Sequence, residues 1–206
     1  MKAIVFLNGE PYRGKIDTAG AYVVASDGGY RETEWRGIKP DLILGDFDSL
    51  GFVPQGAEVF PVEKNATDGE IAVETLIEKK DALSLTEIEI YGGGGGREDH
   101  FLGVLQLLLL AKKHGLGLTI YTNYSKINVQ SCSFSAKTEP GTTISLVPFS
   151  GDVHILSSEG LYYPLKNLTL SQGNTRGISN VATGNTFSLA YEKGDLLVFQ
   201  ILRQAE

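Results

Sequence analysis

Short apolar runs alternate with helical patterns over the larger, amino-terminal part of the chain, and this alternation restricts the fold more than any other feature. The helical patterns are clearest over residues 68–83 and 97–115. The apolar runs lie at residues 3–7, 22–26, 41–45, 58–62, 88–91 and 118–122. Strands that alternate with helices favour a mostly parallel sheet with helices on its faces. We therefore expect an α/β domain with a mostly parallel sheet over residues 1–132.

The pattern changes after about residue 132. Short apolar runs recur there with Ser, Thr, Asn and Gly between them, and no stretch has the length and periodicity of an amphipathic helix. These runs lie at residues 142–149, 152–158, 161–167, 185–195 and 196–202. Such a pattern favours a small antiparallel sandwich or barrel. We expect an all-β domain, most simply a sandwich, over residues 133–206.

The charge balance limits the partners of the chain. Its 206 residues include 18 basic and 25 acidic side chains, which gives a formal net charge of -7. Non-specific binding to nucleic acids or anionic membranes requires basic patches, so we expect neither partner. The opening residues MKAIVFLNGE are typical of a first strand and not of a signal peptide, and the apolar run at 101–111 is too short to span a bilayer. We expect a cytoplasmic protein.

Two carboxylates follow a buried apolar run in the stretch LILGDFDSL, residues 42–50. Their spacing places Asp46 and Asp48 on the same side of an extended backbone. Ligands of open α/β sheets bind beyond the carboxyl ends of the strands, and carboxylate oxygens suit Mg²⁺. A solvated turn explains the same residues equally well, because Gly-Asp and Asp-Ser pairs are frequent in turns. A metal site and a turn therefore remain equal alternatives for this stretch.

A second polar segment, KNATDGEIAV, spans residues 64–73. Thr67 and Glu70 have the spacing of a capping box, and Asp68 would lie in the first helical turn, where a negative charge complements the helix dipole. The functional alternative makes Asp68 a metal ligand and Lys64 a phosphate contact. Capping accounts for the segment by itself, so it is the favoured interpretation of these residues alone.

The run YGGGGGREDH, residues 91–100, follows an expected strand and precedes an expected helix. Glycines at this place let backbone N–H groups approach an anion closely, and a helix N-terminus favours negative charge. Arg97 could bind a phosphate with two hydrogen bonds, Asp99 could cap the helix, and His100 could donate to a phosphate oxygen. A flexible surface loop explains the glycines but not the three polar residues that follow. The run matches neither GxxxxGK[ST] nor GxGxxG.

Taken together, these segments resemble the thiamine pyrophosphokinase family. The resemblance covers nearly the whole chain, and the combination of GDFDS with GGRxDH is its most specific part. The matching segments are SDGG (26–29), GDFDS (45–49), KNATDGE (64–70), GGREDH (95–100), GLYYPL (160–165) and GISN (177–180).

The resemblance implies a fold, a reaction and an assembly. The family has an amino-terminal α/β domain and a carboxyl-terminal β-sandwich, and it forms homodimers whose substrate sites combine domains of both subunits. It transfers the pyrophosphoryl group of ATP to the hydroxyl of thiamine, giving thiamine diphosphate and AMP, with Mg²⁺. Residues 1–132 would then bind nucleotide and metal, and residues 133–206 would bind thiamine and form the dimer.

The resemblance also implies roles for single residues. Asp46, Asp48 and Asp68 are expected around Mg²⁺, and Asp27 and Asp99 in the same acidic cluster. The residues expected to bind ATP and its phosphates are Asp27, Lys64, Gly95, Gly96, Arg97 and His100. Ser179 and Asn180 are expected near the thiamine.

One position departs from the family pattern. The family usually has Lys-Asp-x-Thr-Asp where this chain has Lys64-Asn65-Ala66-Thr67-Asp68. Asn65 keeps an oxygen ligand but lacks the charge, so either metal binding is weaker or the set of ligands differs.

Two other functions fit the same residues. A Mg²⁺-dependent nucleotide pyrophosphohydrolase would release AMP and pyrophosphate from ATP without thiamine. A non-catalytic nucleotide-binding protein would not need the acidic residues that this chain retains at positions 46, 48 and 99.

Overall fold

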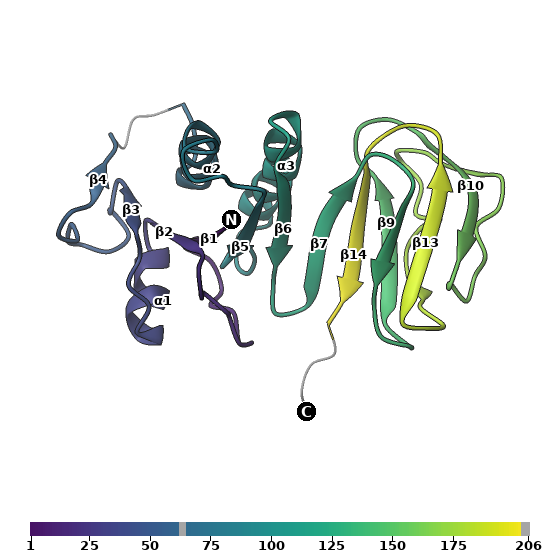
Figure 1. Cartoon of the computed structure of the whole chain (residues 1–206), viewed down its shortest axis with the longest axis horizontal. Helices are drawn as coiled ribbons and strands as arrows, with labels where there is room; N and C mark the ends of the chain where they lie inside the picture. Colours follow the sequence, from purple (N-terminus) through teal and green to yellow (C-terminus); the bar gives the residue numbers. More distant parts are fainter. Residues whose placement is uncertain (62–64, 203–206) are drawn as a thin grey trace. The chain divides into compact units, whose positions relative to one another are not determined.

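The computed structural model describes residues 1–61 and 65–202, and the chain divides into two compact units, residues 1–123 and 124–206 (Figure 1). The change in sequence pattern had suggested a boundary near residue 132. The division falls earlier because the strand β7 (Ser125–Gln130) pairs along its whole length with β14 (Leu196–Ile201). That partner lies near the end of the chain, so β7 belongs to the second unit.

The first unit contains a parallel sheet, as the alternating pattern predicted. Its strands are β1 (Lys2–Phe6), β2 (Tyr22–Ser26), β3 (Leu42–Gly45), β4 (Glu58–Val59), β5 (Glu87–Tyr91) and β6 (Gly117–Tyr121). They pair in the order β4-β3-β2-β1-β5-β6, and every one of these pairs is parallel. Residues 3–6 of the central strand are fully buried, which is typical of a sheet covered on both faces.

The order of the strands identifies where a ligand would bind. The chain runs outward from β1 to β4 and then returns to the other side of β1 to form β5 and β6. The connections that leave β1 and β5 therefore diverge at their carboxyl ends. In open α/β sheets, ligands bind at such a switch point.

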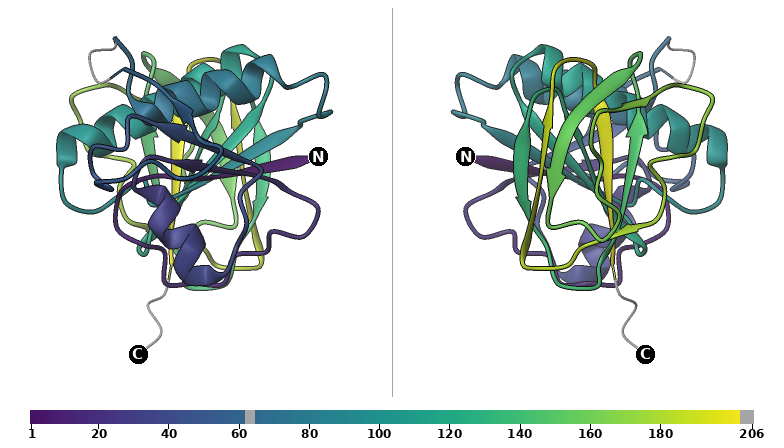
Figure 2. Two further views of the ribbon diagram at one scale, coloured as in Figure 1. Left: turned by 90° about the vertical axis from the view of Figure 1, so that its left-hand side faces the viewer. Right: turned by 90° about the vertical axis from the view of Figure 1, so that its right-hand side faces the viewer.

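Three helices cover this sheet. Figures 1 and 2 show α2 (Asp68–Glu78) and α3 (Glu98–Lys113) on one side and α1 (Gly29–Arg36) on the other. The structure confirms helices in the two segments where the sequence predicted them. It adds α1, which has no apolar periodicity to reveal it. This helix begins directly after the turn residues Asp27 and Gly28, and Gly37, whose φ of 66° is left-handed, caps its carboxyl end.

The second unit is a sandwich of two antiparallel sheets. One has the order β12-β9-β14-β7 and the other the order β11-β10-β13-β8. The remaining strands are β8 (Phe134–Lys137), β9 (Thr143–Pro148), β10 (Val153–Glu159), β11 (Leu168–Leu170), β12 (Asn180–Val181) and β13 (Thr186–Tyr191). Apolar side chains of both sheets form one buried cluster, among them Leu146 and Val198 from the first and Ile155 and Phe187 from the second. The expected all-β sandwich is thus confirmed.

The expected strand at residues 161–167 is wrong. This segment forms only an isolated bridge between Leu161 and Ala182. Pro164 lies in its middle and lacks the N–H group that a strand ladder requires. Within the described residues, no helix is both long and apolar enough to cross a membrane.

Candidate active site

Three carboxylates meet at the carboxyl ends of β2 and β3. Asp27 follows β2, and Asp46 and Asp48 follow β3; each can place an oxygen atom within 4.8 Å of the others. Because β2 and β3 are parallel neighbours, their ends meet at one edge of the sheet. The turn that carries the second pair includes Phe47 at a φ of 60°. Three negative charges this close repel one another unless a cation lies between them.

Asp27 is the buried member of this group, with 7% of its surface exposed. Its Oδ2 accepts hydrogen bonds from Asn8 Nδ2 at 3.2 Å and from Ser49 Oγ at 2.8 Å. Its Oδ1 is also buried but has no hydrogen-bond partner in the described part of the chain. A buried carboxylate oxygen without a partner is costly, and a bound cation removes that cost. This chemistry fits a divalent cation held by oxygen ligands.

The backbone around Asp27 is closely packed. A Cβ atom at Gly45 would lie 3.0 Å from the Asp27 Cα atom, and a Cβ at Gly28 would overlap the Asn8 side chain. Asp27 itself has a φ of 46°, a conformation that non-glycine residues adopt infrequently. Because glycine has no side chain, Gly28 and Gly45 let the segments that follow β1, β2 and β3 pack closely around Asp27.

The glycine run after β5 packs on the loop that follows β1. Glu10 N donates to Gly94 O at 2.7 Å, and a Cβ at Gly9 would overlap the Gly92 carbonyl. A Cβ at Gly95 would lie against the Glu10 side chain, whereas a Cβ at Gly96 would meet nothing within 4 Å. Gly92 and Gly95 are thus needed for close packing against the segment that follows β1, whereas Gly96 has open space around it among the described residues.

Arg97 and Asp99 bind each other at the start of α3. Arg97 Nε lies 3.1 Å from Asp99 Oδ1, and Nη2 lies 2.6 Å from Oδ2. The expectation that Asp99 caps the helix is wrong, because Arg97 occupies the N-cap position and no side chain caps it. The hydrogen bonds to Arg97 hold the pKa of Asp99 below its usual range. Both side chains are largely exposed, as is His100.

Helix α2 begins as the sequence predicted. Thr67 is its N-cap residue, and its side chain accepts a hydrogen bond from Glu70 N at 3.2 Å. Asp68 lies in the first turn and is not a member of the group of three carboxylates. The expected phosphate contact Lys64 lies outside the described residues, and Asn65 is exposed.

In the second unit, the expected thiamine residues Ser179 and Asn180 differ in how exposed they are. Ser179 is exposed, with a φ of 61°, whereas Asn180 is 5% exposed. The Asn180 amide oxygen accepts from Tyr163 N at 3.0 Å and from Val181 N at 2.8 Å, and its Nδ2 donates to Tyr163 O at 2.8 Å. The Asn180 amide group therefore holds the backbone of Tyr163.

Sequence reasoning did not identify the aromatic residues that this asparagine supports. The side chains of Tyr162 and Tyr163 are 65% and 60% exposed, and their ring centroids lie 4.9 Å apart at 86°. Exposed aromatic pairs on a well-ordered backbone are suited to ligand contact. The signal that could have found them is the Tyr-Tyr-Pro sequence, because the proline argues against a central strand and leaves the two tyrosines outside the sheet.

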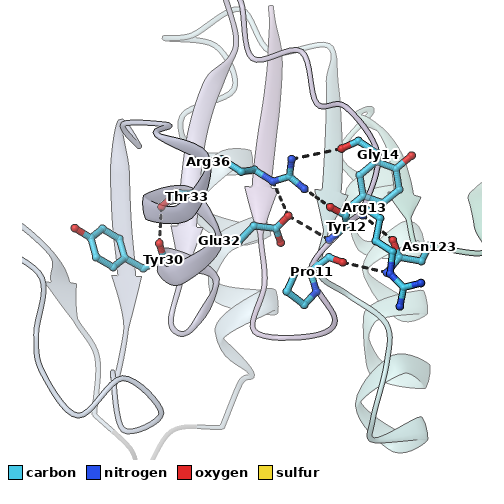
Figure 3. A network of polar contacts seen from close by, with 9 residues as sticks. All are labelled: Pro11, Tyr12, Arg13, Gly14, Tyr30, Glu32, Thr33, Arg36 and Asn123. Atoms are coloured by element: carbon cyan, nitrogen blue, oxygen red, sulfur yellow. Dashed lines mark hydrogen bonds and ion pairs between the residues drawn. The ribbon is translucent and has the colours of Figure 1, made fainter.

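A buried ion pair fixes the loop between β1 and β2. Glu32 and Arg36 of α1 form a salt bridge of 2.8 Å, and Glu32 also accepts from Tyr12 N at 3.2 Å (Figure 3). Arg36 donates to the carbonyl groups of Tyr12 and Gly14, and Asn123 binds neighbouring residues of the loop. The loop that carries Asn8, whose side chain donates to Asp27, is thus anchored at residues 11–14.

Comparisons with known proteins agree with these features. Residues 15–120 match the model "Thiamin pyrophosphokinase, catalytic domain", and residues 131–194 match "Thiamin pyrophosphokinase, vitamin B1 binding domain". The chain is 32% identical to thiamine pyrophosphokinase of Bacillus subtilis over 80% of this chain and 79% of that protein. It is 27% identical to thiamin pyrophosphokinase 1 of Caenorhabditis elegans over 96% of this chain and 87% of that protein.

Solved structures show the same fold. The crystal structure of thiamine pyrophosphokinase from Bacillus subtilis superposes with a TM-score of 0.82 at 26% identity, covering 98% of this chain and 100% of that chain. The enzyme from Geobacillus thermodenitrificans gives a TM-score of 0.81 at 25% identity, covering 100% of this chain and 99% of that one. With two family models matched in order and one relative above 30% identity over most of its length, the chain belongs to the thiamine pyrophosphokinase family.

Proposed function

We propose that this chain transfers the pyrophosphoryl group of ATP to the hydroxyl group of thiamine in a Mg²⁺-dependent reaction. The hydroxyl oxygen attacks the β-phosphorus, the bond from that phosphorus to the α-phosphate oxygen breaks, and AMP leaves while the hydroxyl loses its proton. The products are thiamine diphosphate and AMP. The observation that carries this proposal is the group of three carboxylates in a chain of this family. Within the described residues, one buried oxygen of this group has no hydrogen-bond partner.

The three carboxylates would hold the cation. Asp46 and Asp48 were expected there as ligands, and the geometry supports Asp27, which was expected in the same acidic cluster, as the third ligand. Asp68 remains a proposed further ligand from the family resemblance. Bound Mg²⁺ would offset the negative charge that the ATP phosphates bring to an acidic site. The residues of this chain hold it in place and orient the phosphates.

The start of α3 would bind the phosphates. Gly96 has open space around it, and the helix N-terminus presents backbone N–H groups beside Arg97. Arg97 would exchange one or both of its hydrogen bonds with Asp99 for phosphate oxygens, leaving Asp99 in the acidic cluster. Gly95, His100 and Lys64 complete the proposed phosphate site.

The second unit would bind thiamine. Thiamine carries a positive charge and aromatic rings, so the exposed faces of Tyr162 and Tyr163 offer stacking and cation–π contacts. Ser179 would hydrogen-bond the ligand directly. Asn180, assigned to thiamine from the resemblance, would act by holding the backbone of Tyr163.

The assembly and location are also part of the proposal. From the family resemblance we infer a homodimer in which each site combines the α/β domain of one chain with the sandwich of the other. We place the reaction in the cytoplasm, where ATP is supplied.

The decisive experiment measures AMP released from ATP with and without thiamine, in Mg²⁺ and in excess chelator. We expect AMP release that requires both thiamine and Mg²⁺. In the Asp48→Ala variant we expect activity to fall by about 10²-fold or more, because a charge-stabilising group is lost from the site, while the thermal unfolding midpoint stays close to the parent value.

The alternatives give different outcomes. AMP release without thiamine would identify a pyrophosphohydrolase, and ATP binding without AMP release a non-catalytic protein. Full activity in chelator would exclude the metal.

A further inference from the structure

We propose that Asn8 and Ser49 are positioning residues that turn Asp27 so that its Oδ1 faces the cation. The inference rests on the proposed cation site and assigns roles to two residues outside the expected set. Both residues bind the same oxygen of Asp27. Asn8 Nδ2 reaches Oδ2 at 3.2 Å and Ser49 Oγ reaches it at 2.8 Å, while Oδ1 has no hydrogen-bond partner among the described residues.

Both donors bind Oδ2 of Asp27, and neither binds Oδ1, because of the positions of the two donors in the sheet. Asn8 follows β1 and Ser49 follows the turn after β3, so they reach the carboxylate from the two strands that flank β2. The backbone of Asp27 leaves little freedom, because Gly45 packs against its Cα atom. With Oδ2 held by two donors, rotation of the carboxylate would break both hydrogen bonds. The oxygen without a hydrogen-bond partner among the described residues is therefore the one left to bind a cation among the three carboxylates.

Each donor is itself held in place. The Ser49 carbonyl accepts from Arg31 Nη2 at 2.7 Å, which ties the turn after β3 to α1. The Asn8 side chain lies directly over Gly28, where any Cβ atom would displace it. The loop that begins with Asn8 is anchored further along by Glu32 and Arg36 (Figure 3). Removal of an outer group that orients a metal ligand commonly weakens metal affinity by about 10- to 100-fold.

The test measures Mn²⁺ binding to the whole chain without ATP or thiamine, using the electron paramagnetic resonance signal of free Mn²⁺. We expect Ser49→Ala and Asn8→Ala each to weaken Mn²⁺ binding by about 10- to 100-fold. Ser49→Thr keeps the hydroxyl group and should restore affinity close to that of the parent. Ser26→Ala is the matched control, because Ser26 precedes Asp27 directly and its buried Oγ makes no hydrogen bond in the described structure.

Asp27→Asn separates this inference from the proposed site. If Asp27→Asn loses Mn²⁺ binding while Ser49→Ala and Asn8→Ala bind as the parent does, the positioning roles are wrong and the site stands. If Asp27→Asn also binds normally, Asp27 is not a ligand and both ideas fail. Unfolding midpoints measured in chelator detect a purely structural role: lower stability with unchanged Mn²⁺ affinity would overturn the inference.

Discussion

At the scale of single residues, the oxygen atoms at the end of the sheet differ in what they already bind. Asp27 Oδ2 accepts two hydrogen bonds, whereas its Oδ1 is buried and has no partner among the residues that the structure describes. Asp46 Oδ1 accepts a hydrogen bond from Asp48 N at 3.3 Å. In the proposed cation site, Asp27 would therefore offer its second oxygen to the cation without first giving up a hydrogen bond. The exposed pair of Arg97 and Asp99 is adjustable by comparison, because exposed ion pairs contribute little to stability.

A substitution at Asn65 can test how much negative charge the proposed cation site requires. It stands where the family usually has aspartate, and it is exposed just before α2. We expect Asn65→Asp to retain activity and to bind Mg²⁺ at least as tightly, because an added carboxylate raises the attraction for a cation. Mg²⁺ titrations of the activity of parent and variant provide the measurement. Loss of turnover would instead show that the amide has a specific role in this chain.

At the scale of elements, two helical glycines differ in how much space surrounds them. A Cβ at Gly29, the first residue of α1, would overlap the backbone carbonyl of Phe6, whereas a Cβ at Gly103 in α3 would meet nothing within 4 Å. We expect Gly103→Ala to stabilise the chain by about 0.5–1 kcal/mol, since alanine loses less backbone entropy in a helix. Gly29→Ala should destabilise it by about 1–3 kcal/mol, because the packed backbone must shift. Urea unfolding of both variants measures these changes in the free energy of unfolding. Equal effects of the two substitutions would contradict the packing argument.

A tyrosine cluster on the sheet makes stability sensitive to alkaline pH. The rings of Tyr91 and Tyr121 stack at 5.1 Å, and Tyr91 Oη donates to Glu89 at 3.1 Å. Burial raises the pKa of Tyr121 to about 12, and burial together with Glu89 raises the pKa of Tyr91 as well. The folded state thus keeps these protons to higher pH than the unfolded chain, whose tyrosines titrate near pH ~10.

The sign of the effect follows from this difference. The contribution of Tyr121 to the free energy of unfolding is complete below pH ~10 and is lost as the pH rises from about 10 to about 12. We expect the stability of the parent to fall across this range and that of Tyr121→Phe to fall less steeply. Chemical unfolding at a series of pH values measures both slopes; identical slopes would show that Tyr121 does not contribute.

At the scale of the whole molecule, the proposed phosphate residues lie in the first unit and the proposed thiamine residues in the second. If each site combines domains of two chains, an Asp48→Ala chain and a Ser179→Trp chain, each inactive as a homodimer, should complement each other. One site of the mixed dimer then carries both defects and the other carries neither. Activity measured after subunit exchange should return to a substantial fraction of the parent value.

The control for this experiment is the presence of the mixed dimer. Two different affinity tags and purification over both show that it has formed. A purified mixed dimer without activity would exclude shared sites, and a chain that sediments as a monomer at assay concentration would remove their premise.

Much of this molecule was predictable because the signals are local. Apolar spacing gave the strands from β1 to β6 and the helices α2 and α3, since the periods of strand and helix depend on near neighbours along the chain. The hydrogen bond from Glu70 N to Thr67 was predictable for the same reason. The family followed from short motifs, which are local as well.

Tertiary structure alone decided the rest, because the deciding contacts join distant residues. The resemblance placed Asp27, Asp68 and Asp99 in one acidic cluster with Asp46, but only Asp27 joins Asp46 and Asp48 in the group of three, because β2 and β3 are neighbours and Gly45 permits close approach. Helix α1 lacks apolar periodicity and is stabilised where it packs, through Glu32 and the loop after β1. Asn180 is buried against the backbone of Tyr163, 17 residues away, so its role depends on a fold that no local pattern encodes. Sequence patterns along the chain therefore determined most of the elements and the residue types of the site, because these patterns are local. The packing of the sheet decided which carboxylates meet and which of their oxygen atoms are already hydrogen-bonded, because those contacts join residues that are distant in the sequence.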